Sequence, residues 1–428
     1  MKRIIDFLRS QDGDRFLTGL YCSEKHPSQR DRYLSLLEQF ERNFPNSETI
    51  VILSSPGRTE IGGNHTDHEN GRVLAGAIDL DTLGVAARNN AGIVRLISKG
   101  FLPLEIAIDD LAPRPGERNT SAALVRGLFE YFHQHGLRIG GMDICMTSDV
   151  PGGAGLSSSA SFQMLLAGLL NTLYNAGAID PLFQAQAGRF AESEYFGKPC
   201  GLMDQLTCAL GGLITIDFKD PGQPQVRKLA ADLTAWGYQI VLLDTGGSHA
   251  DLTDEYIAIR REQRSVAEQF GKSVLREVDE SEFTASLPDL RGKVGDRAIL
   301  RAMHFFRDHQ RVSEQVQALE ANQVDRFLQL VRESGESSWM LLQNCYPPGE
   351  KLNQGIPLAL ALSAQILGKR GAWRVHGGGF AGTMQAFVPR DLLGEYVKGM
   401  ERVFGCGACR FVRIRPQGVV RLPLPEGF

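Results

Sequence analysis

The sequence predicts a two-domain α+β protein. The chain has 428 residues, of which 43% are hydrophobic and 22% charged, and this is enough apolar material for two cores. Short β-rich segments dominate up to residue 218, whereas long charged helical segments follow residue 254. A polar stretch at 219–236 separates the two halves, so we expect domains at 1–225 and 226–428.

The first half begins with a helix and then continues largely as sheet. A helix is expected over 30–44, because Tyr33, Leu37 and Phe40 share one face and Pro45 follows. β-rich composition and length predict strands at 48–53, 82–88, 93–98, 104–108, 142–147 and 213–218. Helical periodicity predicts further helices at 121–135, 157–174 and 181–196.

The second half combines long helices with a smaller sheet. A strand is expected at 238–244, and charged helices at 254–270 and 296–322. The segment 373–414 reads as strand, glycine-rich turn, strand, helix and strand. Helices packed on a small sheet are therefore expected here.

Charge and targeting features exclude several classes of protein. The formal net charge is −4 with both signs interspersed, so nucleic acid is not an expected partner. The N-terminus MKRIIDFLRSQDG is interrupted by charge, and the apolar run 356–367 is too short to cross a membrane. The seven scattered cysteines favour free thiols, and CGAC at 406–409 has no second pair to complete a metal site. We expect a cytoplasmic protein that contacts no membrane.

A glycine-rich segment, SDVPGGAGLSSSAS at 148–161, lies between a predicted strand and a predicted helix. Its glycines let backbone N–H groups turn inward, and the helix start adds unpaired N–H groups and a positive dipole. Such a site attracts phosphate, which favours nucleotide binding. Simple helix capping is the rival interpretation, although a cap needs only one hydroxyl.

The stretch SSPGRTEIGGNHTDH at 54–68 crowds an arginine, two acids and two histidines together. Short polar side chains of this kind suit the recognition of hydroxyl groups. A zinc site is the rival, because His and Asp are metal ligands, but it would need a further ligand and would lie beside Arg58.

Four motifs in order carry a resemblance to a known family: PGRTEIGGNHTDH, PGGAGLSSSAS, GKPCGLMDQ and HGGGFAG. Together they resemble the galactokinases, a branch of the GHMP sugar and metabolite kinases, over about residues 33–414. The resemblance implies an N-terminal domain like ribosomal protein S5 domain 2, a ferredoxin-like C-terminal domain and an active site between them. It also implies ATP-dependent phosphorylation of the anomeric hydroxyl of galactose, giving galactose 1-phosphate.

Two residues are implied as catalytic. Arg58 would stabilise the charge on the transferring phosphoryl group, and Asp204 in GLMDQ would accept the proton of the anomeric hydroxyl. A cation beside Asp204 would hold that carboxylate ionised. A purely structural ion pair is the alternative for the same two residues.

The same resemblance implies the binding residues and the cofactors ATP and Mg²⁺. Sugar contacts are implied for Asn64, His65, Asp67, Gly201, Asp204 and Tyr256, although Tyr256 could equally be an ordinary helix-face aromatic. Nucleotide contacts are implied for Gly152, Gly153, Ala154, Gly155, Leu156, Ser157, Ser158 and Ser159. Oxygen ligands for magnesium are implied for Ser158 and Glu192.

The chain departs from the family pattern GEHTDY, because Asn64 replaces the sugar-contacting Glu and His68 replaces the Tyr. Asn64 is expected to face the C6 end of the sugar and to repel a C6 carboxylate less than Glu does. Galactose remains the expected substrate. A 1-kinase for galacturonate or another sugar is one alternative, and a non-catalytic galactose and ATP sensor is another. A monomer with no macromolecular partner is expected.

Overall fold

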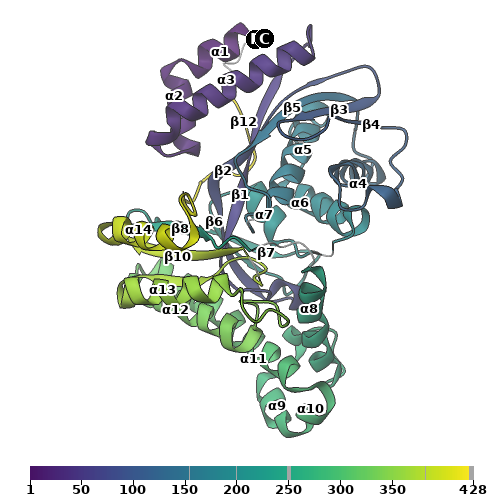
Figure 1. Cartoon of the computed structure of the whole chain (residues 1–428). Coiled ribbons are helices and arrows are strands. Elements are labelled where there is room, and N and C mark those ends of the chain that lie inside the picture. Colours follow the sequence, from purple (N-terminus) through teal and green to yellow (C-terminus); the bar gives the residue numbers. More distant parts are fainter. Residues whose placement is uncertain (154, 199, 248–251, 381, 424–428) are drawn as a thin grey trace.

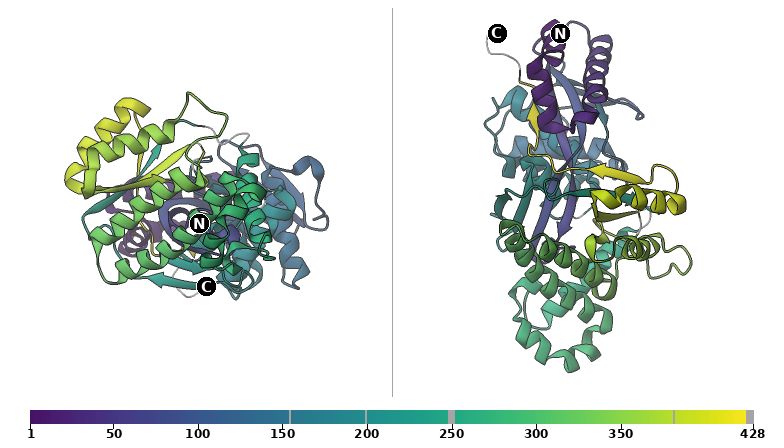
Figure 2. Two further views of the ribbon diagram at one scale, coloured as in Figure 1. Left: turned by 90° about the horizontal axis from the view of Figure 1, so that it is seen from below. Right: turned by 90° about the vertical axis from the view of Figure 1, so that its left-hand side faces the viewer.

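The computed structural model describes residues 1–153, 155–198, 200–247, 252–380 and 382–423. It is an elongated α+β molecule built on two sheets (Figure 1), which confirms the predicted fold class. Three N-terminal helices lie at one end and a small helical group lies at the other, with the sheets between them (Figures 1 and 2).

The larger sheet has eight strands among the described residues, in the order β12-β1-β2-β5-β3-β4, with β6 and β7 continuing from β2. Only the β3–β5 pair is parallel. The bounds are β1 Val51–Gly62, β2 Arg72–Arg88, β3 Ile93–Ser98, β4 Leu104–Ala107, β5 Met142–Ser148, β6 Leu213–Asp217, β7 Gln225–Leu229 and β12 Val420–Arg421.

Helices cover both faces of this sheet, because successive side chains of its strands point to opposite sides. In β1, Val51 and Leu53 pack with α4, α5, α6 and α7, whereas Ile52 packs with α1, α2 and α3. The helices are α1 Lys2–Leu8, α2 Gln11–Leu20, α3 His26–Asn43, α4 Ser121–Gln134, α5 Ser158–Tyr174, α6 Pro181–Phe190 and α7 Met203–Leu210.

The smaller sheet has the order β11-β8-β10-β9 and is also covered on both faces. Val241 and Leu243 face α13 and α14, while Ile240 and Leu242 face α11 and α12. The bounds are β8 Tyr238–Asp244, β9 Ala372–Val375, β10 Thr383–Pro389, β11 Cys409–Val412, α11 Asp296–Glu320, α12 Val324–Ser337, α13 Gly355–Leu367 and α14 Leu393–Phe404.

A helical group at the lower end in Figure 1 has its own core of aliphatic and aromatic side chains. It consists of α8 Thr253–Glu268, α9 Glu280–Ala285, α10 Leu287–Val294 and the start of α11. Its importance for the site is that α8 leads from the cleft into this group.

The first part of the polar stretch at 54–68 is strand, which the sequence did not predict. The strand expected at 48–53 continues to Gly62, with register shifts near Pro56 and Glu60. Every residue of β1 is buried, so the alternation that reveals a strand is missing from its sequence. This correction places Arg58 on a rigid strand in the middle of the sheet.

Two other elements differ from the sequence expectations. β2 begins at Arg72 rather than at residue 82, and it too is buried along almost its whole length. The helix expected at 181–196 ends at Phe190, and a π-helical turn, η4 at Ala191–Phe196, follows it. π-Turns of this kind frequently occur at functional sites.

The predicted domain boundary at 225 falls on the first residue of β7, which still pairs with β6 of the larger sheet. Near the other end of the chain, β12 returns to that sheet and pairs with β1. The division into domains at 225 and 226 therefore stays a prediction.

Candidate active site

A cavity of about 570 Å³ lies between β1, the start of α5, the start of α7, α8 and the turn at 377–378. It gathers predicted residues from distant parts of the chain. Those that line it are Arg58, His65, Asp67, Gly153, Gly155, Leu156, Ser157, Ser158, Ser159, Gly201, Asp204 and Tyr256. Gly152, Asn64 and Glu192 do not line it, and Ala154 lies outside the described residues.

Arg58 and Asp204 form a two-point ion pair at the cavity wall. The guanidinium Nε donates to Asp204 Oδ1 at 2.8 Å and Nη2 donates to Oδ2 at 3.1 Å. Arg58 also donates to the carbonyl of Gly155, and the hydroxyl of Ser157 donates to Asp204. The glycine-rich segment is thereby tied directly to this pair.

The environment of Asp204 keeps its carboxylate ionised. Burial alone would raise its pKa, but Arg58 and the Ser157 hydroxyl outweigh burial and hold the pKa below the ordinary value. The side chain of Asp204 is still 34% exposed, whereas that of Arg58 is only 7% exposed. Asp204 is thus a charged oxygen ligand or proton acceptor that a small molecule in the cavity can reach.

The start of α5 presents backbone donors to the same cavity. Ser157 precedes the helix in a left-handed conformation, with φ 60°, and its side chain does not cap the helix. Its hydroxyl donates instead to Asp204, so the side chain of Ser157 does not cap the first N–H groups of α5. This geometry favours anion binding over the rival interpretation of simple capping.

Glu192 lies in η4 behind the helix start and is 4% exposed. Ser159 Oγ donates to its Oε1 at 3.2 Å, and amides of Gln163 and Gln205 donate to Oε2 at 2.9 and 3.0 Å. The nearest cation is Lys198, at 3.9 Å. A carboxylate beside serine hydroxyls is a set of hard oxygen donors, which is the chemistry that Mg²⁺ prefers.

The opposite end of the cavity carries uncharged and acidic hydrogen-bonding groups. His65 Nε2 donates to Gly378 O at 2.9 Å, and burial lowers the pKa of His65 to about 3, so the ring is neutral. Asp67 packs so closely against Gly201 that a side chain at 201 would collide with its carboxylate. Tyr256 stacks on His65 with ring centroids 6.4 Å apart. These groups suit the binding of a polyhydroxylated molecule.

In the rival zinc site, His65 could offer only its Nδ1, because its Nε2 already donates to a carbonyl. Within the described residues, no group of three or more His, Cys, Asp or Glu side chains is arranged to hold a metal ion.

The expectation that Asn64 contacts the sugar is corrected by the structure. Asn64 is fully buried, and its amide Nδ2 donates to Glu60 Oε1 at 2.9 Å and to Gly377 O at 2.7 Å. Its Oδ1 accepts from Asn344 Nδ2 at 2.8 Å and from Ser338 Oγ at 3.3 Å. All four hydrogen-bonding positions of the amide are thus used by protein groups.

Several cavity residues were not assigned from the sequence, among them the ionisable Glu60, His68, Lys198 and Arg260. Glu60 follows Arg58 by two positions on β1, so recognition of this strand would have placed both on one face. Arg260 follows Tyr256 by four positions on α8 and shares its helix face. Lys198 lies in the motif GKPCGLMDQ, which gave it no role, and Arg260 lies in none of the four motifs.

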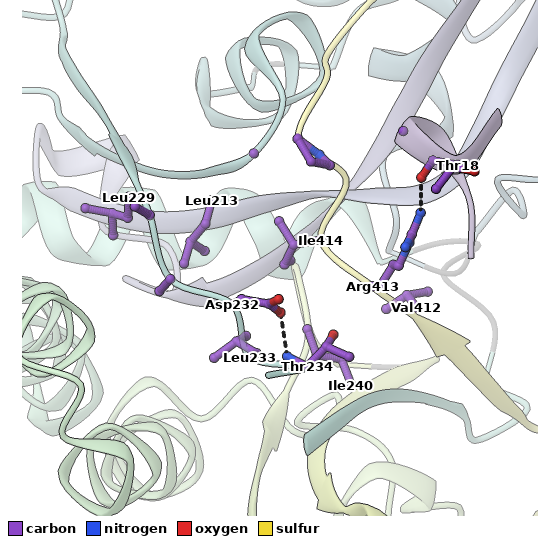
Figure 3. A pocket seen from close by; sticks show the side chains of 15 residues that line it. Thr18, Leu213, Leu229, Asp232, Leu233, Thr234, Ile240, Val412, Arg413 and Ile414 are labelled. Atoms are coloured by element: carbon purple, nitrogen blue, oxygen red, sulfur yellow. Dashed lines mark hydrogen bonds between the residues drawn. The ribbon is translucent and has the colours of Figure 1, made fainter. Parts of the chain in front are cut away.

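A second cavity, of about 400 Å³, lies between α2, the end of β7, β8 and the strand β11 (Figure 3). Figure 3 shows mostly aliphatic side chains, among them Leu213, Leu229 and Ile414. Its two charged side chains are engaged locally: Arg413 donates to Thr18 O at 3.0 Å, and Asp232 accepts from the Thr234 amide at 2.9 Å. This cavity contains none of the predicted site residues.

Two family models match the chain. The galactokinase galactose-binding signature matches residues 38–88, and the GHMP kinases N-terminal domain matches residues 123–212. The first range contains Arg58 and the second contains Asp204.

No described helix is long and apolar enough to cross a membrane.

Comparison with known proteins gives the same family over most of the chain. The galactokinase of Glaesserella parasuis serovar 5 is 31% identical over 82% of this chain and 88% of its own length. That of Streptomyces coelicolor is 30% identical over 87% and 93%. The crystal structure of Lactococcus lactis galactokinase complexed with galactose has a TM-score of 0.79 at 25% identity, covering 91% of this chain and all of that one. The two-sheet fold, the cleft and these relatives together show that the chain belongs to the galactokinase family of the GHMP kinases.

Proposed function

We propose that the protein transfers the γ-phosphoryl group of ATP to the anomeric hydroxyl of galactose, giving galactose 1-phosphate and ADP. The observation that carries this proposal is the ionised carboxylate of Asp204, held by Arg58 between the start of α5 and the hydroxyl-binding end of the cavity. A nucleotide phosphate and a sugar hydroxyl would meet at this carboxylate.

The phosphates of ATP bind at the glycine-rich segment. The uncapped N–H groups of α5, together with Gly153 and Gly155, provide donors and space for the phosphate oxygens. Lys198 lines the same cavity and adds a positive charge. Ser157, Ser158 and Ser159 supply hydroxyl groups beside these donors.

The sugar binds at the other end, with its anomeric hydroxyl beside Asp204. His65, Asp67 and Tyr256 supply hydrogen-bonding groups for the ring hydroxyls, and Gly201 leaves room for the carboxylate of Asp67. As the anomeric oxygen forms its bond to the γ-phosphorus, its proton passes to Asp204. The bond from that phosphorus to the β,γ-bridging oxygen breaks, and ADP leaves.

Arg58 has two tasks in this reaction. Its charge holds Asp204 ionised before the reaction. It also lies beside the point where the phosphoryl group passes, and a cation there stabilises the spread negative charge of the transition state.

Magnesium is expected beside Ser158, which lines the cavity, and Glu192, whose carboxylate accepts from the neighbouring Ser159. Both residues offer the oxygen donors that Mg²⁺ combines with phosphates. The ion would neutralise part of the phosphate charge. We expect a chelator to abolish sugar-dependent ADP release and added Mg²⁺ to restore it without zinc. Stoichiometric zinc in protein purified without added metal would contradict this assignment and favour the histidines of NHTDH.

All the residues assigned to the reaction belong to one chain, so a monomer is expected to be active. A sensor without catalytic activity is disfavoured, because Arg58, Asp204 and the glycine-rich segment form a connected arrangement. A galactose-dependent rate of ADP release separates an enzyme from a sensor.

Galacturonate is the competing substrate, for one specific reason. Arg260 lines the cavity and has no ion-pair partner within 4.0 Å among the described residues, so it is a free cation for a sugar carboxylate. An ADP-release assay over free hexoses, uronic acids and pentoses tests the proposal. We expect galactose to give the highest kcat/KM. A preference for galacturonate, or no response to any sugar, would overturn it.

A further inference from the structure

Glu60 is a buried carboxylate in the wall of the catalytic cavity. It is 3% exposed and lies on β1 two positions after Arg58. The pairing of Arg58, Thr59 and Glu60 with β2 is regular, so Arg58 and Glu60 point to the same face about 7 Å apart along the strand. Because Arg58 marks the anomeric end of the sugar, Glu60 lies towards the far side of the ring.

The two oxygens of this carboxylate have different surroundings. Oε1 accepts from Arg374 Nη2 at 2.6 Å and from Asn64 Nδ2 at 2.9 Å. Oε2 has no hydrogen-bond partner in the described part of the chain, and it is not sealed from solvent. One oxygen therefore anchors the group, while the other remains available to a molecule in the cavity.

The anchor is held in place because both donors are fully buried. Arg374 lies on β9 of the smaller sheet. Asn64 is held by Gly377 O and by the amide of Asn344. Groups from both sheets thus fix the direction in which Glu60 presents its free oxygen.

We infer that Glu60 accepts a hydrogen bond from a hydroxyl on the side of the galactose ring remote from the anomeric carbon, and that Asn64 and Arg374 position its carboxylate. This inference rests on the proposed function of the cavity. It gives Asn64 an indirect role, since its amide holds a carboxylate and does not itself contact the sugar.

The charge environment of Glu60 agrees with this role. Burial raises the pKa of Glu60 to about 7, against the attraction of Arg374 and Arg58. At and above that pH the carboxylate is a strong acceptor for a hydroxyl and repels a sugar carboxylate brought against it. Glu60 therefore favours a neutral sugar at its end of the cavity.

The test compares the wild-type enzyme with Glu60→Gln on galactose and on 3-deoxy-, 4-deoxy- and 6-deoxygalactose. We expect the variant to lose about 10- to 100-fold in kcat/KM for galactose, mainly through KM, since a hydrogen bond to a charged group is lost. One deoxy sugar should be penalised strongly in the wild type and only a few-fold in the variant. That sugar identifies the hydroxyl that Glu60 binds.

Glu262→Gln is the matched control, because Glu262 also pairs with a fully buried arginine, Arg301, but does not line the cavity. It should leave the ratios among the four sugars unchanged. If Glu60→Gln does not fold, Glu60→Asp keeps the charge opposite Arg374 and withdraws the carboxylate by one methylene, with the same expected loss of discrimination.

Several results would overturn the inference. An equal loss in the variant for all four sugars would make Glu60 purely structural, and unchanged kinetics would remove it from the site. If the wild type released no ADP with galactose, the proposed function would fail first and the inference with it. If the wild-type enzyme is active but penalises the deoxy sugars no more than Glu60→Gln does, the inference fails and the proposed function stands.

Discussion

Asp204→Asn is expected to lower kcat by about 10²–10⁴-fold, the range typical for removal of a general base. The amide keeps the shape of the carboxylate but cannot take the proton of the anomeric hydroxyl at neutral pH. Galactose and ATP should still bind within a few-fold of the wild-type affinity, which calorimetry can measure. The loss should therefore appear in turnover and not in binding.

A matched control for this variant is Asp143→Asn. Asp143 forms a similar two-point pair with Arg95, at 2.7 and 2.9 Å, but it lies on β5 away from the cavity. Asp143→Asn should lower the stability of the protein as Asp204→Asn does, but it should leave kcat unchanged. Near wild-type turnover of Asp204→Asn would show that Asp204 is not the base.

Arg58→Ala is expected to lose up to about 10³-fold in kcat, at the lower end of the effects known for catalytic arginines. The variant should also change the pH profile. Arg58 now holds the pKa of Asp204 below its ordinary value, so its removal should raise that pKa. The acid limb of kcat/KM should then move to higher pH, because Asp204 becomes protonated earlier as the pH falls.

The control for Arg58→Ala is Arg95→Ala, which breaks the equivalent pair with Asp143. Its pH profile should coincide with that of the wild type. A slower Arg58→Ala enzyme with an unshifted acid limb would mean that Arg58 does not set the charge of Asp204.

Several elements could be predicted closely from the sequence. The strand at Ile93–Ser98 and the strand at Tyr238–Asp244 have the predicted bounds, and α5 begins one residue after its predicted start. The sequence predicts too early an end for β1, because both faces of this strand are buried and its glycines are typical of a turn. The error mattered, since a strand at 58–60 puts Glu60 beside Arg58.

The chemistry of the site could be predicted better than the direction of its side chains. The motifs named Arg58 and Asp204, and the structure brings these two together. No motif could show that Asn64 is enclosed by groups from residues 338, 344 and 377, because those contacts join segments more than 270 positions apart. These distant segments bury Asn64, so its amide supports Glu60 and does not line the cavity.

The position of the phosphate on the product tests the central claim most directly. After incubation of the protein with MgATP and galactose, proton–phosphorus correlation NMR of the sugar phosphate shows which proton couples to phosphorus. The geometry of Asp204 and Arg58 predicts coupling to the anomeric proton, as in galactose 1-phosphate. Coupling to the two C6 protons would show that the sugar binds in the opposite direction and would contradict the account.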